Sequence, residues 1–209
     1  MTLSTPINIP GLIDKFGIIS DQVERNELIA LLGEFIRVIK NSDGAIVEFG
    51  CYIGTTSLYI RRILDMLEQH NEFYVYDSFE GLPDKRSEDI SPLGIQFVAG
   101  ELQVTKKQFI REFHKAGLKL PVIHKCWFSN LSAEDVPDAI SFAFLDGDYY
   151  ESVMTPLKLI ESKLAKNAVI VIDDYGNQAL PGAAKAVDEW CRVHRYTVRV
   201  VHSLAIIHT

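Results

Sequence analysis

The sequence lacks several features that would assign it to whole classes of protein. Its three cysteines, Cys51, Cys126 and Cys191, are widely spaced and form no CxxC pair, which argues against a disulfide framework or a zinc site and predicts free thiols. It has no run of about 18 apolar residues and no basic, apolar leader at its N-terminus. We therefore predict a cytoplasmic protein that has no membrane partner.

Positive charge and linker sequence are also scarce. The 21 lysines and arginines are outnumbered by 28 aspartates and glutamates, giving a formal net charge of −7 at pH 7. Nucleic acids and anionic membranes both attract a basic face, so this charge argues against either partner. With 209 residues, 47% of them hydrophobic, and no repeat or linker, we expect one full core. Residues 1–44 should form an N-terminal arm and helix, either part of the same domain or a lid, in front of a main domain at 45–209.

Strand patterns alternate with helix patterns along the chain. This alternation predicts an α/β fold with a mainly parallel sheet and an antiparallel last strand. The residues before about Ile19 contain prolines and glycines and are interpreted as an irregular arm. Strands are predicted at 45–49, 73–76, 120–125, 140–145, 168–172, 197–201 and 204–207, and helices at 20–41, 55–68, 105–116, 152–164 and 183–194.

A glycine-containing turn follows the first predicted strand. Glu48, Gly50 and Gly54 give the pattern ExGxxxG, which differs from the dinucleotide fingerprint GxGxxG. An acid just before the first glycine suits a cationic or hydrogen-bond-donating ligand better than a pyrophosphate, and this favours S-adenosylmethionine over NAD. The glycines could equally be ordinary turn residues. Asp77, at the end of the second strand, could accept hydrogen bonds from a ribose or cap the turn, and Trp127 could cover an adenine ring or plug the sheet edge.

Four aspartates follow two neighbouring predicted strands. Asp146 and Asp148 come after the fourth strand, and Asp173 and Asp174 come after the fifth. Strands joined by one crossover helix usually lie side by side, and ligands gather beyond the carboxyl ends of parallel strands. The four carboxylates should therefore converge, and a divalent cation is the simplest way to relieve their mutual repulsion. Helix capping is the alternative role for acids at these positions.

Several motifs together resemble a known family of enzymes. They are VEFGCYIGTTS, YDSFEGLP, LDGDYYES, VIDDYG and PGAAKAVDEW, and the match spans most of the chain from Ile46 to Trp190. These motifs are similar to those of the macrocin O-methyltransferases, the metal-dependent sugar methyltransferases of macrolide and aminocoumarin antibiotic pathways. The resemblance implies a Rossmann-like class I methyltransferase sheet of seven mostly parallel strands with an antiparallel last strand and helices on both faces. Residues 45–209 would then form an S-adenosylmethionine-dependent methyltransferase domain.

The same resemblance implies roles for individual residues. Magnesium, or another divalent cation, would be held by Asp146, Asp173 and Asp174, and Asp148 would be the general base. The donor S-adenosylmethionine would contact residues at the ends of the first four strands, namely Glu48, Gly50, Gly54, Thr55, Asp77, Ser78, Phe79, Cys126, Trp127 and Asp146.

These roles predict an O-methyltransferase of natural product biosynthesis that acts on a vicinal diol, most simply on a sugar. A metal that holds two neighbouring hydroxyls lowers the pKa of the acceptor, and a nearby carboxylate can then remove the proton. The alternatives are a catechol-type O-methyltransferase, a metal-dependent phosphoryl-transfer enzyme and a non-catalytic S-adenosylmethionine-binding module. The phosphoryl-transfer alternative would need basic residues near the acids, and DGDYYES and DDYGNQ supply none. The expected partner is a small-molecule diol or glycoside, and a homo-oligomer remains open.

Overall fold

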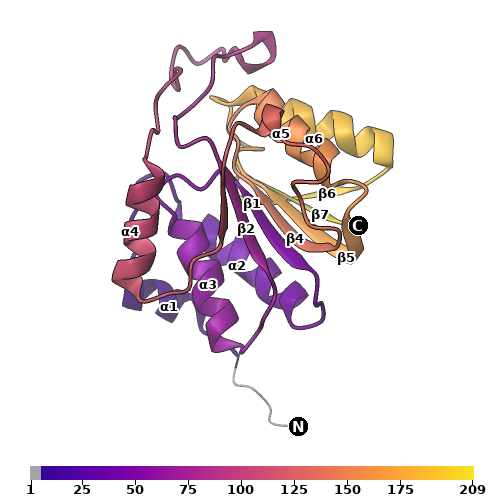
Figure 1. Cartoon of the computed structure of the whole chain (residues 1–209). Coiled ribbons are helices and arrows are strands. Elements are labelled where there is room, and N and C mark those ends of the chain that lie inside the picture. The colour runs from indigo at the N-terminus through magenta and orange to yellow at the C-terminus, as the bar shows by residue number, and fades with distance from the viewer. Residues whose placement is uncertain (1–5) are drawn as a thin grey trace.

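The computed structural model describes residues 6–209, and its centre is a seven-stranded sheet (Figure 1). The strand order is β3-β2-β1-β4-β5-β7-β6; β1 to β5 pair in parallel, and β7 pairs antiparallel with both β5 and β6. The predicted fold class is therefore confirmed, including the antiparallel last strand. The strands are β1 Ala45–Phe49, β2 Phe73–Asp77, β3 Val122–Lys125, β4 Ile140–Leu145, β5 Leu164–Ile172, β6 Val198–Val201 and β7 Leu204–His208.

Helices cover both faces of the sheet, as Figure 1 shows. Successive side chains of a strand point to opposite faces, so Ile46 and Val47 of β1 belong to two different cores. The core around Ile46 is closed by α1 to α4, and the core around Val47 is closed by α5 and α6. The helices are α1 Ile9–Phe16, α2 Arg25–Ile39, α3 Thr55–Met66, α4 Lys106–Ala116, α5 Tyr150–Ile160 and α6 Pro181–His194. Among residues 6–209 no helix combines the length and the apolar character that a bilayer crossing requires.

The N-terminal region differs from its prediction. The segment interpreted as an irregular arm contains α1, which Asn8 caps by accepting a hydrogen bond from Gly11 N–H and which ends at Gly17. Pro10 stands in the first turn of this helix, where no N–H donor is needed. The predicted start of the next helix at Ser20 is wrong, because Glu24 caps α2 by accepting from Asn26 N–H at 2.6 Å. Residues 1–5 of the predicted arm lie outside the described residues.

Other element boundaries agree closely with local sequence signals. Thr105 and Gln108 form a reciprocal capping box at the start of α4, and Gly117 ends that helix in the left-handed conformation. The largest differences lie between 150 and 172, where α5 spans Tyr150–Ile160 instead of 152–164 and β5 already begins at Leu164. The strand β3 begins two residues later than predicted, and α6 begins two residues earlier. The early part of β5 has no alternating apolar pattern, so the sequence does not predict it as strand. The ladder that this part forms with β4 is also irregular near Ile140.

Candidate active site

A cavity of about 770 Å³ opens at the carboxyl ends of the central strands. Its floor is formed by the turns that follow β1, β4 and β5, where Gly50, Asp146 and Asp174 lie. Gly50 has a φ of +85°, and a Cβ there would lie 1.9 Å from the backbone oxygen of Asp146. Only glycine allows these two turns to approach so closely. The first glycine of the ExGxxxG pattern therefore brings the β1 turn against the first acid motif.

Three carboxylates meet at this floor. Asp146, Asp148 and Asp174 each offer an oxygen, and these oxygens all lie within 4.8 Å of one another. Asp148 and Asp174 have φ values of +60° and +58°, a conformation that is uncommon outside glycine and that concentrates at functional sites. An all-oxygen set at this spacing fits a hard divalent cation such as Mg²⁺ or Ca²⁺. The predicted convergence of acids from two strands is thus present in the structure.

Asp173 lines the same cavity but lies outside that group of three. Its Oδ1 accepts hydrogen bonds from Asp174 N–H at 2.8 Å and from the Ser203 hydroxyl at 3.4 Å. Glu27 of α2 in turn accepts hydrogen bonds from both the backbone N–H and the hydroxyl of Ser203. Within the described chain, both hydrogen bonds that reach Asp173 go to Oδ1, and Oδ2 accepts none. A metal-ligand role for Asp173 stays a prediction.

Burial and mutual repulsion make these acids hard to ionise without a counter-charge. The pKa values of Asp146 and Asp148 are raised well above the ordinary range, first by burial and then by the neighbouring aspartates. Burial and Asp174 also raise the pKa of Asp173 to about 7, and burial raises that of Asp174. A bound cation would remove this penalty because it favours the ionised form of every carboxylate that it contacts.

Without a cation, stability should consequently fall as the pH rises, and a cation should reduce this fall. Because folding raises the pKa of Asp173 to about 7, its protonated form stabilises the fold, and that contribution is lost as the pH rises through this value. In chelator we expect the Tm at pH 8 to be at least about 3 °C lower than at pH 5.5, since 1 kcal/mol corresponds to roughly 2–4 °C in a protein of this size. Millimolar Mg²⁺ should raise the Tm at pH 8 and have little effect at pH 5.5. Scanning fluorimetry measures both, and an equal or higher Tm at pH 8 in chelator would contradict the prediction.

The structure divides the predicted donor-binding residues into two groups. Those with surface in the cavity are Gly50, Asp77, Ser78, Cys126, Trp127 and Asp146. Those that lie behind the cavity wall are Glu48, Gly54, Thr55 and Phe79. A direct donor contact for either group stays a prediction, but the second group has structural partners of its own.

Glu48 and Gly54 show what those structural partners are. The carboxylate of Glu48 is buried and accepts a hydrogen bond from the Ser57 hydroxyl at 2.5 Å, and burial raises its pKa to about 8. Gly54 has a φ of +96°, and a Cβ there would lie 2.8 Å from the ring of Phe109. Phe79 packs on the same Phe109 ring, with 5.9 Å between ring centroids. These residues hold the β1 turn and the start of α3 in place.

Asp77 organises the turn that precedes α3. Its Oδ2 accepts hydrogen bonds from the N–H groups of Cys51 and Tyr52, at 2.8 and 3.3 Å, and its Oδ1 accepts from Phe79 N–H at 2.6 Å. The capping role that the sequence left open is therefore present. Each carboxylate oxygen can accept further hydrogen bonds, so a ribose contact stays a prediction.

Trp127 and Phe128 face the cavity near the end of β3. Phe128 also packs edge-on against Phe49 of β1, with 5.5 Å between ring centroids, and so belongs to the core on that face of the sheet. Trp127 makes no such stacking contact within the described residues and has the flat apolar face that an adenine ring can stack on.

The sequence did not indicate the residues that line the cavity on the side opposite its floor. They lie in the long segment between β2 and α4, in α2 and at the start of α5, and include Glu27, Lys85, Arg86, Asp89, Phe97, Tyr149 and Glu151. The sequence did indicate a long functional loop after β2. It could not indicate which of its residues face the site, because their partners are distant along the chain.

Comparisons with known proteins agree with this geometry. A family model described as Macrocin-O-methyltransferase (TylF) matches residues 26–203, which is most of the chain. No curated protein sequence matches the chain.

Solved structures resemble the fold closely. The O-methyltransferase NovP superposes with a TM-score of 0.80 at 22% sequence identity, covering 89% of this chain and 80% of NovP. The calicheamicin methyltransferase CalS11 superposes with a TM-score of 0.76 at 18% identity, covering 98% of this chain and 87% of CalS11. An apo structure of CalS11, described as a TDP-rhamnose 3'-O-methyltransferase, has a TM-score of 0.67 at 15% identity and covers 98% of this chain and 88% of its own. Likeness at these identities establishes the fold.

Proposed function

This chain belongs to the macrocin O-methyltransferase (TylF) family of S-adenosylmethionine-dependent O-methyltransferases, and we propose that it methylates a hydroxyl of a vicinal diol on a natural-product sugar with the help of a divalent cation. The observation that carries the proposal is the meeting of Asp146, Asp148 and Asp174 at the floor of the cavity. Three carboxylates in this arrangement could hold a divalent cation. An acceptor with two adjacent hydroxyls would suit such a cation better than one with a single hydroxyl, because both oxygens could act as ligands. Family membership sets aside the phosphoryl-transfer alternative.

In this proposal the carboxylates have two different tasks. Asp146 and Asp174 hold the cation, joined by Oδ2 of Asp173, and Asp148 takes the proton from the acceptor hydroxyl. The cation supplies positive charge that lowers the pKa of the acceptor hydroxyls. As the acceptor oxygen forms a bond to the methyl carbon, the carbon–sulfur bond breaks and its electron pair stays on sulfur. The proton ends on Asp148, so charge and atoms balance.

In this proposal the donor binds on the side of the cavity that is formed by the carboxyl ends of β1 to β3. Asp77 can accept hydrogen bonds from ribose hydroxyls, and Trp127 can cover the adenine ring. Glu48 and Gly54 act on the donor through the backbone of the turn that they support. The methyl group is then directed towards the aspartates at the ends of β4 and β5.

The charge of the cavity should disfavour anionic acceptors even when a cation compensates the four aspartates that follow β4 and β5, because the other acids that line it still outnumber its cationic side chains. Two cationic side chains, Lys85 and Arg86, line it, and Arg86 already forms an ion pair with Glu151 at 2.6 Å. The acids that line it are Asp21, Glu27, Asp77, Asp84, Asp89, Asp146, Asp148, Glu151, Asp173 and Asp174. Bringing a diphosphate against like charge is unfavourable by several kcal/mol, so we expect a neutral glycoside to have a kcat/KM at least about tenfold higher than a nucleotide-diphosphate sugar with the same diol. Steady-state kinetics on such a pair measures this, and a preference for the sugar nucleotide would contradict it.

A direct test of the function combines binding and turnover. Calorimetry should detect S-adenosylmethionine binding, and a panel of neutral glycosides and catechols should reveal a methylated product by mass spectrometry. We expect methylation of a sugar diol that stops in chelator and returns with Mg²⁺. Methylation of catechols alone would favour the catechol-type alternative, and donor binding without turnover of any diol would favour a non-catalytic module.

A further inference from the structure

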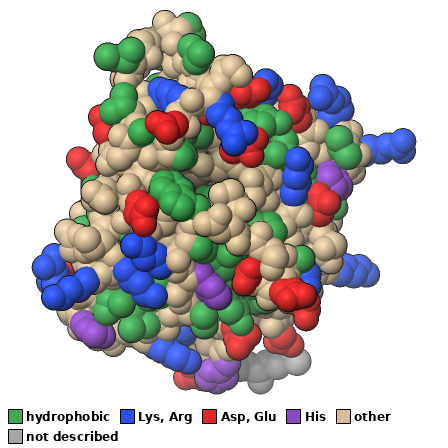
Figure 2. All heavy atoms as spheres, turned by 45° about the horizontal axis from the view of Figure 1, so that its top comes forward, with side chains coloured by type: hydrophobic (Ala, Val, Ile, Leu, Met, Phe, Trp, Pro, Cys, Tyr) green, Lys and Arg blue, Asp and Glu red, His purple; other side chains and the backbone are tan. Residues whose placement is uncertain are grey.

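The cavity is closed on one side by a long segment, residues 80–104, that rises between β2 and α4 and that we name the wall segment (Figure 1). Leu82, Phe97 and Leu102 of this segment face the cavity. Its tip projects from the molecule and carries apolar side chains, visible in green at the top of Figure 2. The exposed apolar residues of the wall segment are Ile90, Leu93, Ile95 and Val98. A segment so exposed at its tip needs a firm attachment elsewhere if it is to shape the cavity.

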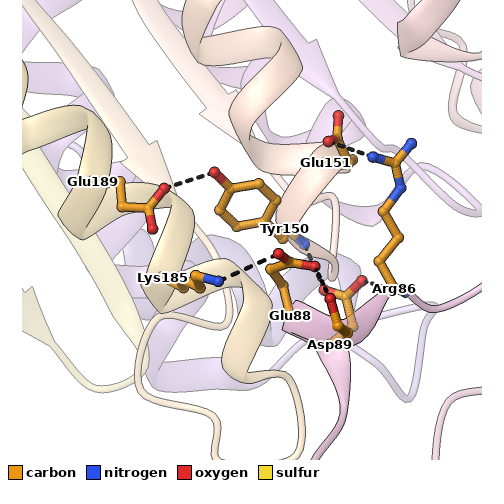
Figure 3. A network of polar contacts seen from close by, with 8 residues as sticks. Arg86, Glu88, Asp89, Tyr150, Glu151, Lys185 and Glu189 are labelled. Carbon is orange, nitrogen blue, oxygen red and sulfur yellow. Dashed lines mark hydrogen bonds and ion pairs between the residues drawn. The ribbon is translucent and has the colours of Figure 1, made fainter.

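That attachment is centred on Asp89 (Figure 3). Although it is a carboxylate, Asp89 is only 1% exposed. Its Oδ2 accepts a hydrogen bond from Arg86 N–H at 3.0 Å, and its Oδ1 accepts one from Tyr150 N–H, the first residue of α5, at 2.7 Å. The residue before α5, Tyr149, provides no side-chain cap. Asp89 therefore caps α5 from the wall segment, where a carboxylate is favoured by the positive end of the helix.

The start of α6 is shaped to admit the same carboxylate. A Cβ on Gly182 would lie 1.9 Å from Oδ1 of Asp89 and 2.7 Å from the nitrogen of Tyr150. Leu180, which precedes α6, also gives that helix no side-chain cap. One buried carboxylate thus sits between the N-terminal ends of two helices, and glycine leaves the space for it.

The two helices that Asp89 contacts follow the two acid motifs. The helix α5 begins two residues after Asp148, and α6 begins seven residues after Asp174. The surrounding ion pairs, Arg86 with Glu151 at 2.6 Å and Lys185 with Glu88 at 3.4 Å, are largely exposed and each contributes little (Figure 3). The buried carboxylate of Asp89 ties the wall segment to the catalytic turns. Two further hydrogen bonds assist it, from the Tyr149 hydroxyl to the backbone oxygen of Phe97 at 2.6 Å and from the Ser91 hydroxyl to that of Gln178 at 2.9 Å.

We propose that Asp89 is a positioning residue that fixes the wall segment to the starts of α5 and α6 and thereby sets the acceptor side of the cavity and the place of Asp148. This inference rests on the proposed function for its kinetic consequences. Asp77 is held by its own hydrogen bonds from Cys51, Tyr52 and Phe79, and Trp127 follows β3, so donor affinity should be almost independent of Asp89. The expected signature is a rise in acceptor KM and a fall in kcat without a change in donor binding.

Asp89→Ala and Gly182→Ala test the same contact from its two sides. Each should lower kcat/KM for the acceptor by about 10–100-fold, because small displacements of reacting groups have effects of this size. The Kd for S-adenosylmethionine should stay within about twofold, because the hydrogen bonds of Asp89 go to Arg86 and Tyr150 and not to the predicted donor residues. The loss in the double variant should be smaller than the product of the two single losses, since both substitutions disturb the contact of Asp89, and a Cβ at Gly182 would add only its approach of 2.7 Å to the nitrogen of Tyr150. Effects that multiply in the double variant, or a donor Kd that weakens in parallel with activity, would overturn the proposal.

Two further measurements test the attachment of the wall segment without a turnover assay. Trypsin can cleave the wall segment after Lys85 and Arg86, and release of the segment in either single variant should speed this cleavage by about fivefold or more. Asp89→Asn keeps one acceptor for Tyr150 N–H and should lie between wild type and Asp89→Ala in cleavage rate. Glu88→Gln, which breaks only an exposed ion pair, serves as the matched control and should behave as wild type. Wild-type cleavage rates in both Asp89→Ala and Gly182→Ala would refute the attachment even if the proposed function were wrong.

Discussion

Asp148→Asn is expected to lower kcat by about 10²–10⁴-fold, the usual contribution of a positioned general base. Asparagine keeps the shape and the hydrogen-bonding capacity of the side chain but cannot accept a proton. If Asp148 is the base, the affinities for S-adenosylmethionine and for Mg²⁺ should remain close to those of the wild type. Steady-state methylation assays give kcat, and calorimetry gives the affinities for S-adenosylmethionine and for Mg²⁺.

Asp146→Asn is the matched control for this variant, because it changes the same motif at a residue assigned to the cation. It should weaken Mg²⁺ binding, and high Mg²⁺ should recover part of its activity. The oxygen of Asp148 lies within 4.8 Å of those of Asp146 and Asp174, so the structure also permits Asp148 to hold the cation. Loss of Mg²⁺ affinity in Asp148→Asn that equals the loss in Asp146→Asn would replace the base assignment with a ligand assignment. Full activity of Asp148→Asn would exclude both.

The arrangement of the site could be predicted from the sequence because it follows from the alternation of strands and helices. Apolar runs at 140–145 and 168–172 with one helix between them predict adjacent parallel strands, and β4 does pair with β5. Acids that follow adjacent strands then lie at one edge of the sheet. This is why Asp146, Asp148 and Asp174 could be placed together without knowledge of any long-range contact.

Contacts between distant segments could not be predicted in the same way. The hydrogen bond from Tyr150 to Asp89 spans 61 residues, and the one from Ser203 to Glu27 spans 176. Periodicity reports only on neighbours within a helix or strand, so nothing in the sequence marks Asp89 as a cap for α5. The helix α1 was not predicted for a different reason. The prolines and glycines of its segment indicated an arm or a lid, whereas Pro10 stands in the first turn of the helix and Gly17 is its C-cap.

A motif shared with a family also cannot separate residues that touch a ligand from those that support them. Glu48 and Gly54 belong to the ExGxxxG pattern, yet both lie behind the cavity, against Ser57 and Phe109. The Glu48 carboxylate and the absence of a Cβ at Gly54 set the course of the turn after β1. A substitution at Glu48 should therefore act on donor affinity through the position of the β1 turn.

Asp174→Ala is expected to have the second large effect. Removing a cation ligand at the floor of the cavity should raise the Mg²⁺ concentration for half-maximal activity by at least about 100-fold, since even residues that only orient the ligands are worth 10–100-fold in metal affinity. Excess Mg²⁺ should restore part of the activity, because the acceptor and donor contacts remain. The measurement is methylation rate against free Mg²⁺, with Asp188→Ala as a control because Asp188 bonds Tyr175 at the surface. An unchanged Mg²⁺ requirement would remove Asp174 from the cation site.

Two substitutions of Asp173, compared in the same assay, distinguish a supporting role from a role as a cation ligand. Its Oδ1 accepts the hydrogen bond from Asp174 N–H at 2.8 Å, and an asparagine in its place can still accept that bond. If Asp173 only supports the backbone of Asp174, Asp173→Asn should require no more Mg²⁺ than the wild type, and Asp173→Ala should require more. If Oδ2 of Asp173 also binds the cation, Asp173→Asn should itself weaken Mg²⁺ binding, because it loses the negative charge that attracts the ion. A wild-type Mg²⁺ requirement in both variants would leave Asp146 and Asp174 as the cation ligands and assign Asp173 to neither task.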